Sequence, residues 1–285
     1  MYVMVNGARL FFDTVGSGLD LEATGMAQRP ALIVLHGGPG FDHSTMRPYF
    51  DRFADTHQVI YLDHRGNGRS GGEPETWRLA QWGDDIDGFC QALGVEAPVI
   101  FGQSFGGMAA MAYATRHPDK PAKVVLSSTA ARMRLDITYQ MMARLGGHRA
   151  ADIARRFWSD PSPEAASEYT SVCMPLYNPG DNPALSEGRA RAVTRYEVMF
   201  AFIGGEQRTM DFRPDLARIT SHTLILAGGL DPITPLACAE EMSAALPPGV
   251  GRLEVFEGAG HGIYRTEPER AEALIRAFLA EPTPA

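Results

Sequence analysis

One stretch, residues 99–110, restricts the fold more than any other part of this sequence. The apolar run Val99-Ile100-Phe101 leads straight into Gly102-Gln103-Ser104-Phe105-Gly106, and small helix-forming residues follow. This pattern predicts a strand, one very tight turn and a helix, because glycines on both sides of Ser104 let the strand and helix backbones approach closely. Ser104 would then adopt a strained conformation that presents its hydroxyl at the carboxyl edge of a sheet, beside the unpaired N–H groups of the helix. The same residues also fit a glycine-rich turn with an incidental serine, so a nucleophile requires partner residues elsewhere.

Two later loops carry such partners. The buried-strand run 223–227 ends shortly before Asp231, and the run 253–256 ends shortly before His261. The three residues therefore occur in the order Ser, Asp, His, each on a loop that follows a strand. A neutral imidazole can accept the serine proton during attack, and a carboxylate can fix the tautomer of that imidazole. We expect Ser104, Asp231 and His261 to form a catalytic triad.

A glycine-rich loop, His36-Gly37-Gly38-Pro39-Gly40, follows the apolar run 31–35. Backbone N–H groups in such a loop are free to bind the negative charge that develops on a substrate oxygen. We assign one oxyanion donor to the N–H of Gly38 and the other to the N–H of Phe105, with Gly37 as the alternative to Gly38. His36 is expected to brace the loop.

Buried-strand runs alternate with helical patterns along most of the chain. This alternation predicts an α/β fold with a mostly parallel sheet and helices on both faces, and it places the loops discussed above at one sheet edge. Residues 1–15 are typical of two short strands joined at Asn6-Gly7, a strong hairpin signal. Residues 131–211 contain no buried-strand run and are rich in helix formers and aromatic residues. We therefore expect a core domain of residues 1–130 and 212–285, and a helical cap domain of residues 131–211 that roofs the substrate pocket.

The composition limits the partners of the chain. A net charge of -8 without a Lys/Arg block argues against nucleic acid or an anionic membrane surface as a partner. The three cysteines are widely spaced and include no C-x-x-C pair, as expected of reduced thiols in a cytoplasmic protein without a zinc site. No secretory signal or membrane-spanning run is visible. We expect no metal, no cofactor and a small-molecule or short-peptide substrate, while the oligomeric state stays open.

Other polar residues lie on the same predicted loops. Asp63 and Arg65 follow the strand run 59–62 and are expected to form a charge-assisted clamp that shapes their loop. His43 and His64 belong to the same predicted edge of the sheet and are candidates to line the pocket.

With these residues in place, the chain resembles the α/β-hydrolase superfamily over nearly its full length, and within it the proline iminopeptidase group. The motif His36-Gly37-Gly38-Pro39-Gly40, with His43 three positions on, is that group's hallmark. The pattern Asp63-x-Arg65-Gly66-x-Gly68-x-Ser70 also fits, with His64 where the group often has Gln. The resemblance implies an α/β-hydrolase fold with a mostly parallel eight-stranded sheet and an inserted helical cap. It also implies catalytic roles for Ser104, Asp231 and His261, and an oxyanion site at Gly38 and Phe105.

In the group, carboxylates of the cap hold the free α-amino group of the substrate. The run Arg195-Tyr196-Glu197 resembles the aromatic-Glu pair that carries one of them, so the resemblance implies substrate binding by Glu197, Tyr196 and Gly37, with Glu206 as a second candidate carboxylate. The chain departs from the group in having Phe105 where Trp usually follows the serine, and in its short cap.

Three functions are consistent with these features. The first is an aminopeptidase or amidase that forms an acyl-enzyme and releases an N-terminal residue, preferably proline, from small peptides or amides. The second is a carboxylic ester or lactone hydrolase whose pocket lacks an ammonium-binding carboxylate. The third belongs to another class, a non-hydrolytic receptor that keeps the fold for ligand binding.

Overall fold

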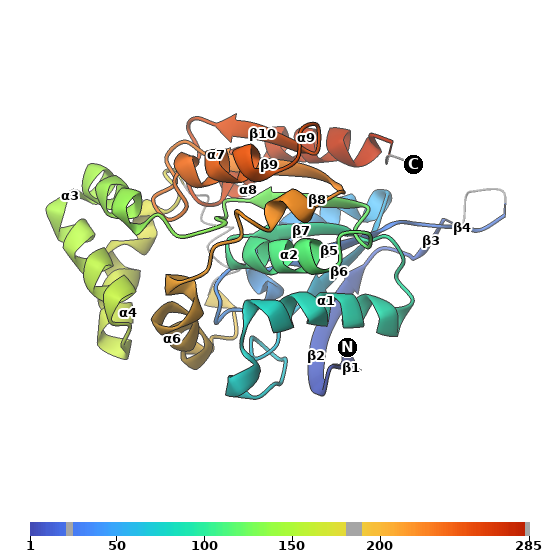
Figure 1. Ribbon diagram of the computed structural model, residues 1–285, viewed down its shortest axis with the longest axis horizontal. Helices are drawn as coiled ribbons and strands as arrows, with labels where there is room; N and C mark the ends of the chain where they lie inside the picture. The colour runs from blue at the N-terminus through green and yellow to red at the C-terminus, as the bar shows by residue number, and fades with distance from the viewer. Residues whose placement is uncertain (21–24, 181–189, 283–285) are drawn as a thin grey trace.

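A computed structural model describes residues 1–20, 25–180 and 190–282. An eight-stranded sheet with the order β1-β2-β6-β5-β7-β8-β9-β10 forms its centre (Figure 1). The strands are β1 (Tyr2–Val5), β2 (Ala8–Val15), β5 (Ala31–Leu35), β6 (Gln58–Leu62), β7 (Val99–Gln103), β8 (Lys123–Ser127), β9 (His222–Gly228) and β10 (Gly251–Phe256). β2 pairs antiparallel with β1 and with β6, and all the other neighbouring strands are parallel. The mostly parallel sheet that the sequence pattern predicts is confirmed, as are the eight strands that the family resemblance implies.

The first hairpin forms where the sequence predicts it. Asn6 and Gly7 both have positive φ, 47° and 76°, as a two-residue hairpin turn of the primed type requires. Val5 consequently pairs with Ala8 across the turn. A second, two-stranded sheet of β3 (Leu19–Asp20) and β4 (Ala27–Gln28) projects from the main sheet (Figure 1) within the connection between β2 and β5.

Helices cover both faces of the sheet. The α-helices are α1 (Leu79–Leu93), α2 (Phe105–Arg116), α3 (Leu135–Ser159), α4 (Pro163–Val172), α6 (Tyr196–Gly204), α7 (Leu236–Ala245), α8 (Ile263–Thr266) and α9 (Pro268–Ala280). In the described part of the chain, six short 3-10 segments join them, η1 (His43–Met46), η2 (Tyr49–Asp55), η3 (Pro74–Thr76), η4 (Met174–Leu176), η5 (Glu206–Arg208) and η6 (Leu216–Arg218). Helices α1, α2 and α7 bury their apolar residues against one face, whereas η2 and α9 do so against the other.

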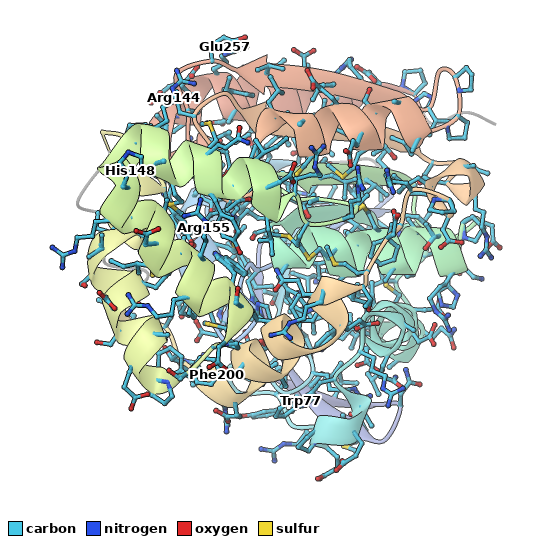
Figure 2. The ribbon with its side chains drawn as sticks, turned by 60° about the vertical axis from the view of Figure 1, so that its left-hand side comes forward. Trp77, Arg144, His148, Arg155, Phe200 and Glu257 are labelled. Carbon is cyan, nitrogen blue, oxygen red and sulfur yellow. The ribbon has the colours of Figure 1, made fainter. Side chains whose placement is uncertain are left out.

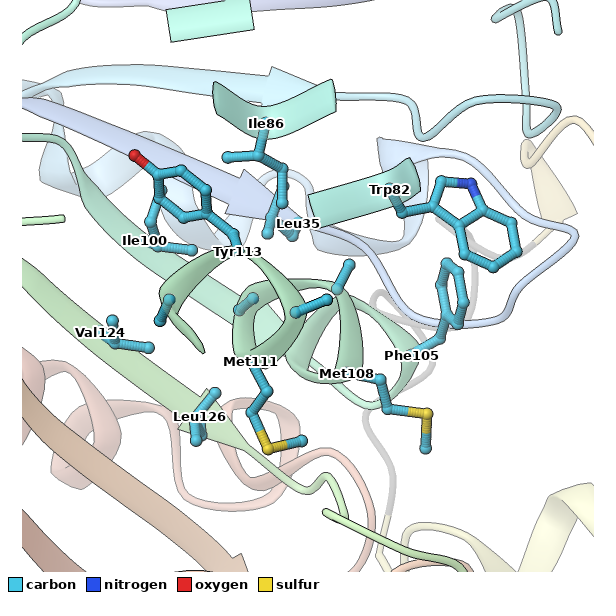
Figure 3. Close-up of a cluster of buried hydrophobic side chains, with 14 of the residues drawn as sticks. Leu35, Trp82, Ile86, Ile100, Phe105, Met108, Met111, Tyr113, Val124 and Leu126 are labelled. Atoms are coloured by element: carbon cyan, nitrogen blue, oxygen red, sulfur yellow. The ribbon is translucent and has the colours of Figure 1, made fainter. Parts of the chain in front are cut away.

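The core continues through the sheet because both faces of the parallel strands are apolar. In β7, Ile100 packs into the cluster on one face, and Val99 and Phe101 pack into the cluster on the other. Figure 3 shows the first of these clusters around α2. The ring of Phe105 meets Trp82 of α1 edge-on, with 4.8 Å between ring centroids. Full burial of side chains of this size stabilises the fold by roughly 2–3 kcal/mol each, so this contact anchors the helix that begins beside Ser104.

Residues 131–211 connect β8 to β9 and hold α3, α4, η4, α6 and η5, without a strand among their described residues; residues 181–189 lie outside the description. Figure 1 shows α3, α4 and α6 gathered at the end of the sheet away from β3 and β4. The segment has an apolar cluster of its own, in which the rings of Phe157 and Tyr169 stack at 4.4 Å. Figure 2 shows Arg144 and Arg155 on α3, where both side chains are exposed.

The two ends of this segment meet each other. The N–H of Phe212 donates to the carbonyl oxygen of Ala131 at 2.9 Å. The division into core and cap domains stays a prediction. Among the described residues, no helix has the length and apolar character needed to cross a lipid bilayer.

Candidate active site

Ser104 sits at the turn between β7 and α2 with φ 55° and ψ -120°, a strained conformation for a residue with a side chain. A Cβ on Gly102 would lie 2.7 Å from the Cα of Gly107, and a Cβ on Gly106 would lie 2.7 Å from the carbonyl oxygen of His36. Both flanking glycines are therefore required by close backbone approach, as the sequence predicts. The N–H of Ser104 donates to the carbonyl oxygen of Ser127 at 3.0 Å, and this hydrogen bond connects the turn to β8.

The structure brings Ser104, His261 and Asp231 together in one hydrogen-bonded chain. The Nε2 atom of His261 lies 3.0 Å from the Oγ atom of Ser104. The Nδ1 atom of the same ring lies 2.9 Å from Oδ2 and 3.1 Å from Oδ1 of Asp231. Because a carboxylate accepts, Nδ1 carries the proton, and Nε2 is left as the acceptor for the serine hydroxyl.

Asp231 is fully buried and is held in place by the loop that carries it. Its Oδ1 atom accepts from the N–H groups of Ile233 and Thr234 at 2.8 and 3.0 Å, and its Oδ2 atom accepts from the Thr234 hydroxyl at 2.8 Å. These bonds compensate the buried charge and fix the plane of the carboxylate. Sequence reasoning missed Thr234, although an Asp followed by Pro and a nearby Thr is typical of a side-chain-capped turn.

The loop after β5 lies directly over the serine. A Cβ on Gly37 would lie 2.5 Å from Oε1 of Gln103 and 3.3 Å from the Cβ of Ser104, so glycine allows this approach without a shift of its neighbours. The N–H of Phe105 is the first of α2 and has no intrahelical acceptor. The ring of His36 contacts the carbonyl oxygen of Gly37 through Nδ1 at 2.7 Å and accepts from the N–H of His64 through Nε2 at 3.3 Å. His36 thus braces the loop, as the sequence predicts, and turns the next peptide N–H, that of Gly38, away from itself.

A cavity of about 260 Å³ opens above Ser104 and His261. Its walls come from the core loops and from residues 131–211, here called the inserted segment. The walls are mainly apolar and include Met108, Met133, Phe157, Met199, Phe202 and Ile203. No Asp or Glu lines it among the described residues. A site of this shape suits a small, largely apolar substrate group.

The predicted substrate-binding residues divide into two groups. Gly37 and Tyr196 line the cavity. Glu197 does not: its side chain is 58% exposed and lies 3.8 Å from Arg195. Glu206 also lies elsewhere, because its Oε2 atom accepts from the N–H of Leu79 at 2.7 Å and caps the start of α1. Neither carboxylate faces the cavity, so the binding role assigned to Glu197 stays a prediction without support from its position.

The loop after β6 corrects two further expectations. Arg65 does not pair with Asp63 but forms a bidentate, buried ion pair with Asp85 of α1, with distances of 2.6 and 2.7 Å. His43 and His64 are buried and do not line the cavity. Burial lowers the pKa of His64 well below its usual value, and the neighbouring His36 lowers it further. The Nε2 atom of His64 is buried without a hydrogen-bond partner among the described residues.

One buried cluster offers ligand atoms that could in principle hold a metal ion. Donor atoms of Asp42, His43 and Asp63 lie within 4.8 Å of one another. They already bind protein groups: His43 Nδ1 contacts Asp63 at 2.7 Å, and Arg69 contacts Asp42 at 2.5 Å. These contacts explain the cluster as part of the loop scaffold.

The inserted segment contacts the loop that carries His261 (the histidine loop), and sequence reasoning did not predict these contacts. The N–H of Gly262 donates to Oδ1 of Asn178 at 2.5 Å, and the ring of Tyr177 meets the His261 ring edge-on at 5.3 Å. A Cβ on Gly260 would collide with the carbonyl oxygen of Tyr177. These contacts join residues that are far apart in the sequence, so no local sequence pattern predicts them.

The fold and this geometry define an α/β hydrolase. The family model described as alpha/beta hydrolase fold matches residues 30–268, and the chain belongs to that family.

Its relatives have several hydrolase names. The chain is 27% identical to a putative carbamate hydrolase, RutD, of Caulobacter sp. strain K31, over 86% of this chain and 94% of that protein. It is 25% identical to the proline iminopeptidase PfmaB of Pestalotiopsis fici, over 98% of both chains. Among solved structures, an esterase from Thermogutta terrifontis has a TM-score of 0.73 at 26% identity, covering 98% of both chains. The resemblance to proline iminopeptidases is confirmed at the level of the family, and the relatives support a hydrolytic enzyme.

Proposed function

We propose that the chain is a serine hydrolase in which Ser104 is the nucleophile, His261 the general base and Asp231 the residue that orients it. The observation that carries the proposal is the 3.0 Å approach of His261 Nε2 to Ser104 Oγ, with Nδ1 bonded to Asp231. A serine hydroxyl becomes an effective nucleophile only when such a base accepts its proton during attack.

The same geometry supports a two-step reaction. Ser104 Oγ attacks the substrate carbonyl carbon while His261 Nε2 takes the hydroxyl proton, and the carbonyl oxygen becomes an oxyanion that the N–H groups of Gly38 and Phe105 stabilise. Collapse breaks the bond to the leaving group, which receives the proton from His261, and leaves an acyl-enzyme. A water molecule, deprotonated by His261, then attacks the acyl carbon. The bond between that carbon and Ser104 Oγ breaks, the carboxylic acid leaves, and Oγ takes the proton from His261.

For the substrate, we propose a small carboxylic ester or lactone with an apolar acyl group. The cavity walls support this choice, since they are mainly apolar and include no Asp or Glu among the described residues. An α-ammonium group without a carboxylate partner would lose its hydration in such a cavity. We also propose that residues 131–211 act as the cap domain that roofs this pocket, over a core of residues 1–130 and 212–285.

Release of an N-terminal residue is the second candidate. Tyr196 lines the cavity, in agreement with the aromatic residue of the aminopeptidase pattern, and relatives of this name match nearly the whole chain. Glu197 is the carboxylate that this activity would need, which makes it the residue to test.

Two measurements test these proposals. A fluorophosphonate probe should label the protein and fail to label Ser104→Ala, whereas equal labelling of both would contradict the assignment of Ser104 as the nucleophile.

Hydrolysis of p-nitrophenyl butyrate should be faster than that of proline β-naphthylamide, and Glu197→Gln should change neither rate. If Glu197→Gln selectively lowers aminoacyl hydrolysis, the second candidate is the correct one. If neither labelling nor turnover occurs, the fold serves as a receptor.

A further inference from the structure

We propose that Arg265 makes the site selective for substrates that carry a carboxylate group besides the bond to be cleaved. This inference deepens the function proposed above and rests on it. Arg265 lies in α8, four positions after His261, and lines the same cavity as Ser104. Among the described residues that line the cavity, it is the one with a permanent charge.

The side chain of Arg265 is held among the residues that line the cavity. Its Nη2 atom donates to the carbonyl oxygen of Thr45, another lining residue, at 3.0 Å. A Cβ on Gly262 would lie 3.0 Å from the Cδ atom of Arg265, so the glycine leaves room for the aliphatic stem. The guanidinium carbon also lies 5.4 Å from the centre of the Tyr264 ring. These contacts limit the rotamers available before a ligand arrives.

No carboxylate of the described part of the chain neutralises this guanidinium. Neighbouring arginines differ in this respect: Arg270 pairs with Glu267 at 3.2 Å, and Arg276 pairs with Glu272 at 2.8 Å. The Thr45 contact uses one of the five N–H donors of Arg265. The remaining donors include enough of the planar fork to bind a carboxylate with two hydrogen bonds.

The surroundings favour an anionic partner. Arg265 is only partly exposed, and the cavity walls are mainly apolar, so a charge placed there is screened less than on an open surface. A carboxylate on the substrate would compensate the arginine charge, while the apolar part of the same molecule would contact the walls. The proposed substrate class is therefore an ester or lactone of mixed character, apolar near the scissile bond and anionic at one end.

Two matched substrate pairs test the proposal and locate the carboxylate. The first pair is mono-p-nitrophenyl adipate and its methyl ester, which differ in a carboxylate on the acyl side. The second is m-carboxyphenyl butyrate and its methyl ester, which differ on the leaving-group side. We expect kcat/KM to favour the acid in one pair by at least about tenfold, the size of one charge-assisted hydrogen-bond pair. The preference should shrink as ionic strength rises.

Substitutions connect the preference to Arg265. Arg265→Gln should lower the acid-to-ester ratio of kcat/KM at least about tenfold. Arg265→Lys keeps the positive charge but lacks the planar pair of N–H donors, so its ratio should lie between those of the wild type and Arg265→Gln. Arg144→Gln is the matched control, because Arg144 is exposed on α3 (Figure 2) and does not line the cavity. The proposal is overturned if the wild-type protein favours the acid in neither pair, or if Arg265→Gln leaves the ratios unchanged.

A binding measurement separates this proposal from the hydrolase proposal. Calorimetric titration of Ser104→Ala with monomethyl adipate should show tighter binding than titration with dimethyl adipate, and adding Arg265→Gln should abolish the difference. Equal binding of the two probes would refute the role of Arg265 even in an active enzyme. If the protein shows neither turnover nor fluorophosphonate labelling but still binds monomethyl adipate more tightly than dimethyl adipate, only the hydrolase proposal is refuted.

Discussion

The main-chain N–H of His261 donates a 2.7 Å hydrogen bond to the carbonyl oxygen of Tyr177, so the proposed general base is bonded to the inserted segment. Asn178 adds a second bond to the same loop through the N–H of Gly262. The position of the imidazole relative to Ser104 therefore depends on the segment above the sheet as well as on the sheet itself. Four predictions follow from contacts of this kind.

Replacing Asn178 by Ala should lower kcat/KM by about tenfold or more. The variant leaves the buried N–H of Gly262 without its acceptor, and the histidine loop can then shift by enough to weaken the Ser104 contact. Steady-state kinetics and the rate of fluorophosphonate labelling should fall together. Glu168→Gln serves as the control on α4, since that side chain is 37% exposed in its pair with Arg156. Normal kinetics in Asn178→Ala would show that the loop holds its position unaided.

Replacing Thr234 by Val should lower kcat by roughly ten- to 150-fold, which corresponds to the loss of one hydrogen bond to a charged group. The valine removes the hydroxyl donor to Oδ2 of Asp231 and leaves that oxygen with only the His261 bond. Thr234→Ser keeps the donor and should restore most of the rate. An equal loss in both variants would assign the effect to packing around the turn.

Asp85 and Asp84 are neighbours in sequence but should differ sharply in their contribution to stability. Asp85→Asn leaves the Arg65 charge buried without a counter-ion, and we expect the free energy of unfolding to fall by about 3–5 kcal/mol. Asp84 pairs with Arg116, whose side chain is 43% exposed, so Asp84→Asn should cost less than about 1 kcal/mol. Urea unfolding monitored by tryptophan fluorescence provides both values. Similar losses would contradict the distinction between buried and exposed pairs.

Acid should destabilise the protein below a pH of about 6.5, the usual pKa of histidine, because burial lowers the pKa values of His36 and His64 in the folded state. Between the unfolded and folded pKa values the unfolded chain binds more protons, so the free energy of unfolding decreases as the pH falls. Each histidine contributes a slope of up to about 1.4 kcal/mol per pH unit.

His64→Gln provides the test of this pH dependence. The variant removes one titrating group and should reduce the slope by about that amount. His36 and His57, whose pKa values burial also lowers, account for the remainder. Urea unfolding at several pH values measures the slope. An unchanged slope would show that His64 protonates in the folded protein.

The sequence predicted those parts of the fold and site that depend on local pattern. Buried-strand runs predicted the parallel strands because a strand covered on both faces is apolar throughout, and the chain order of Ser104, Asp231 and His261 predicted their meeting at one edge. The partner of Arg65 could not be predicted, because Asp85 lies on a helix whose rotation is set by packing. Glu197 illustrates the same limit. Helix α6 is apolar around most of its circumference, so periodicity alone did not indicate that Val198 would be buried and Glu197 exposed.

The hydrogen bond between Phe212 and Ala131 closes the inserted segment at its base, because it joins the two ends of that segment. The strands on either side, β8 and β9, are direct parallel neighbours and keep their register whatever lies between them. Substrate range and sheet architecture can therefore diverge separately during evolution. A different segment could be inserted between Ala131 and Phe212, provided that it supplies residues that replace Tyr177 and Asn178 in positioning His261.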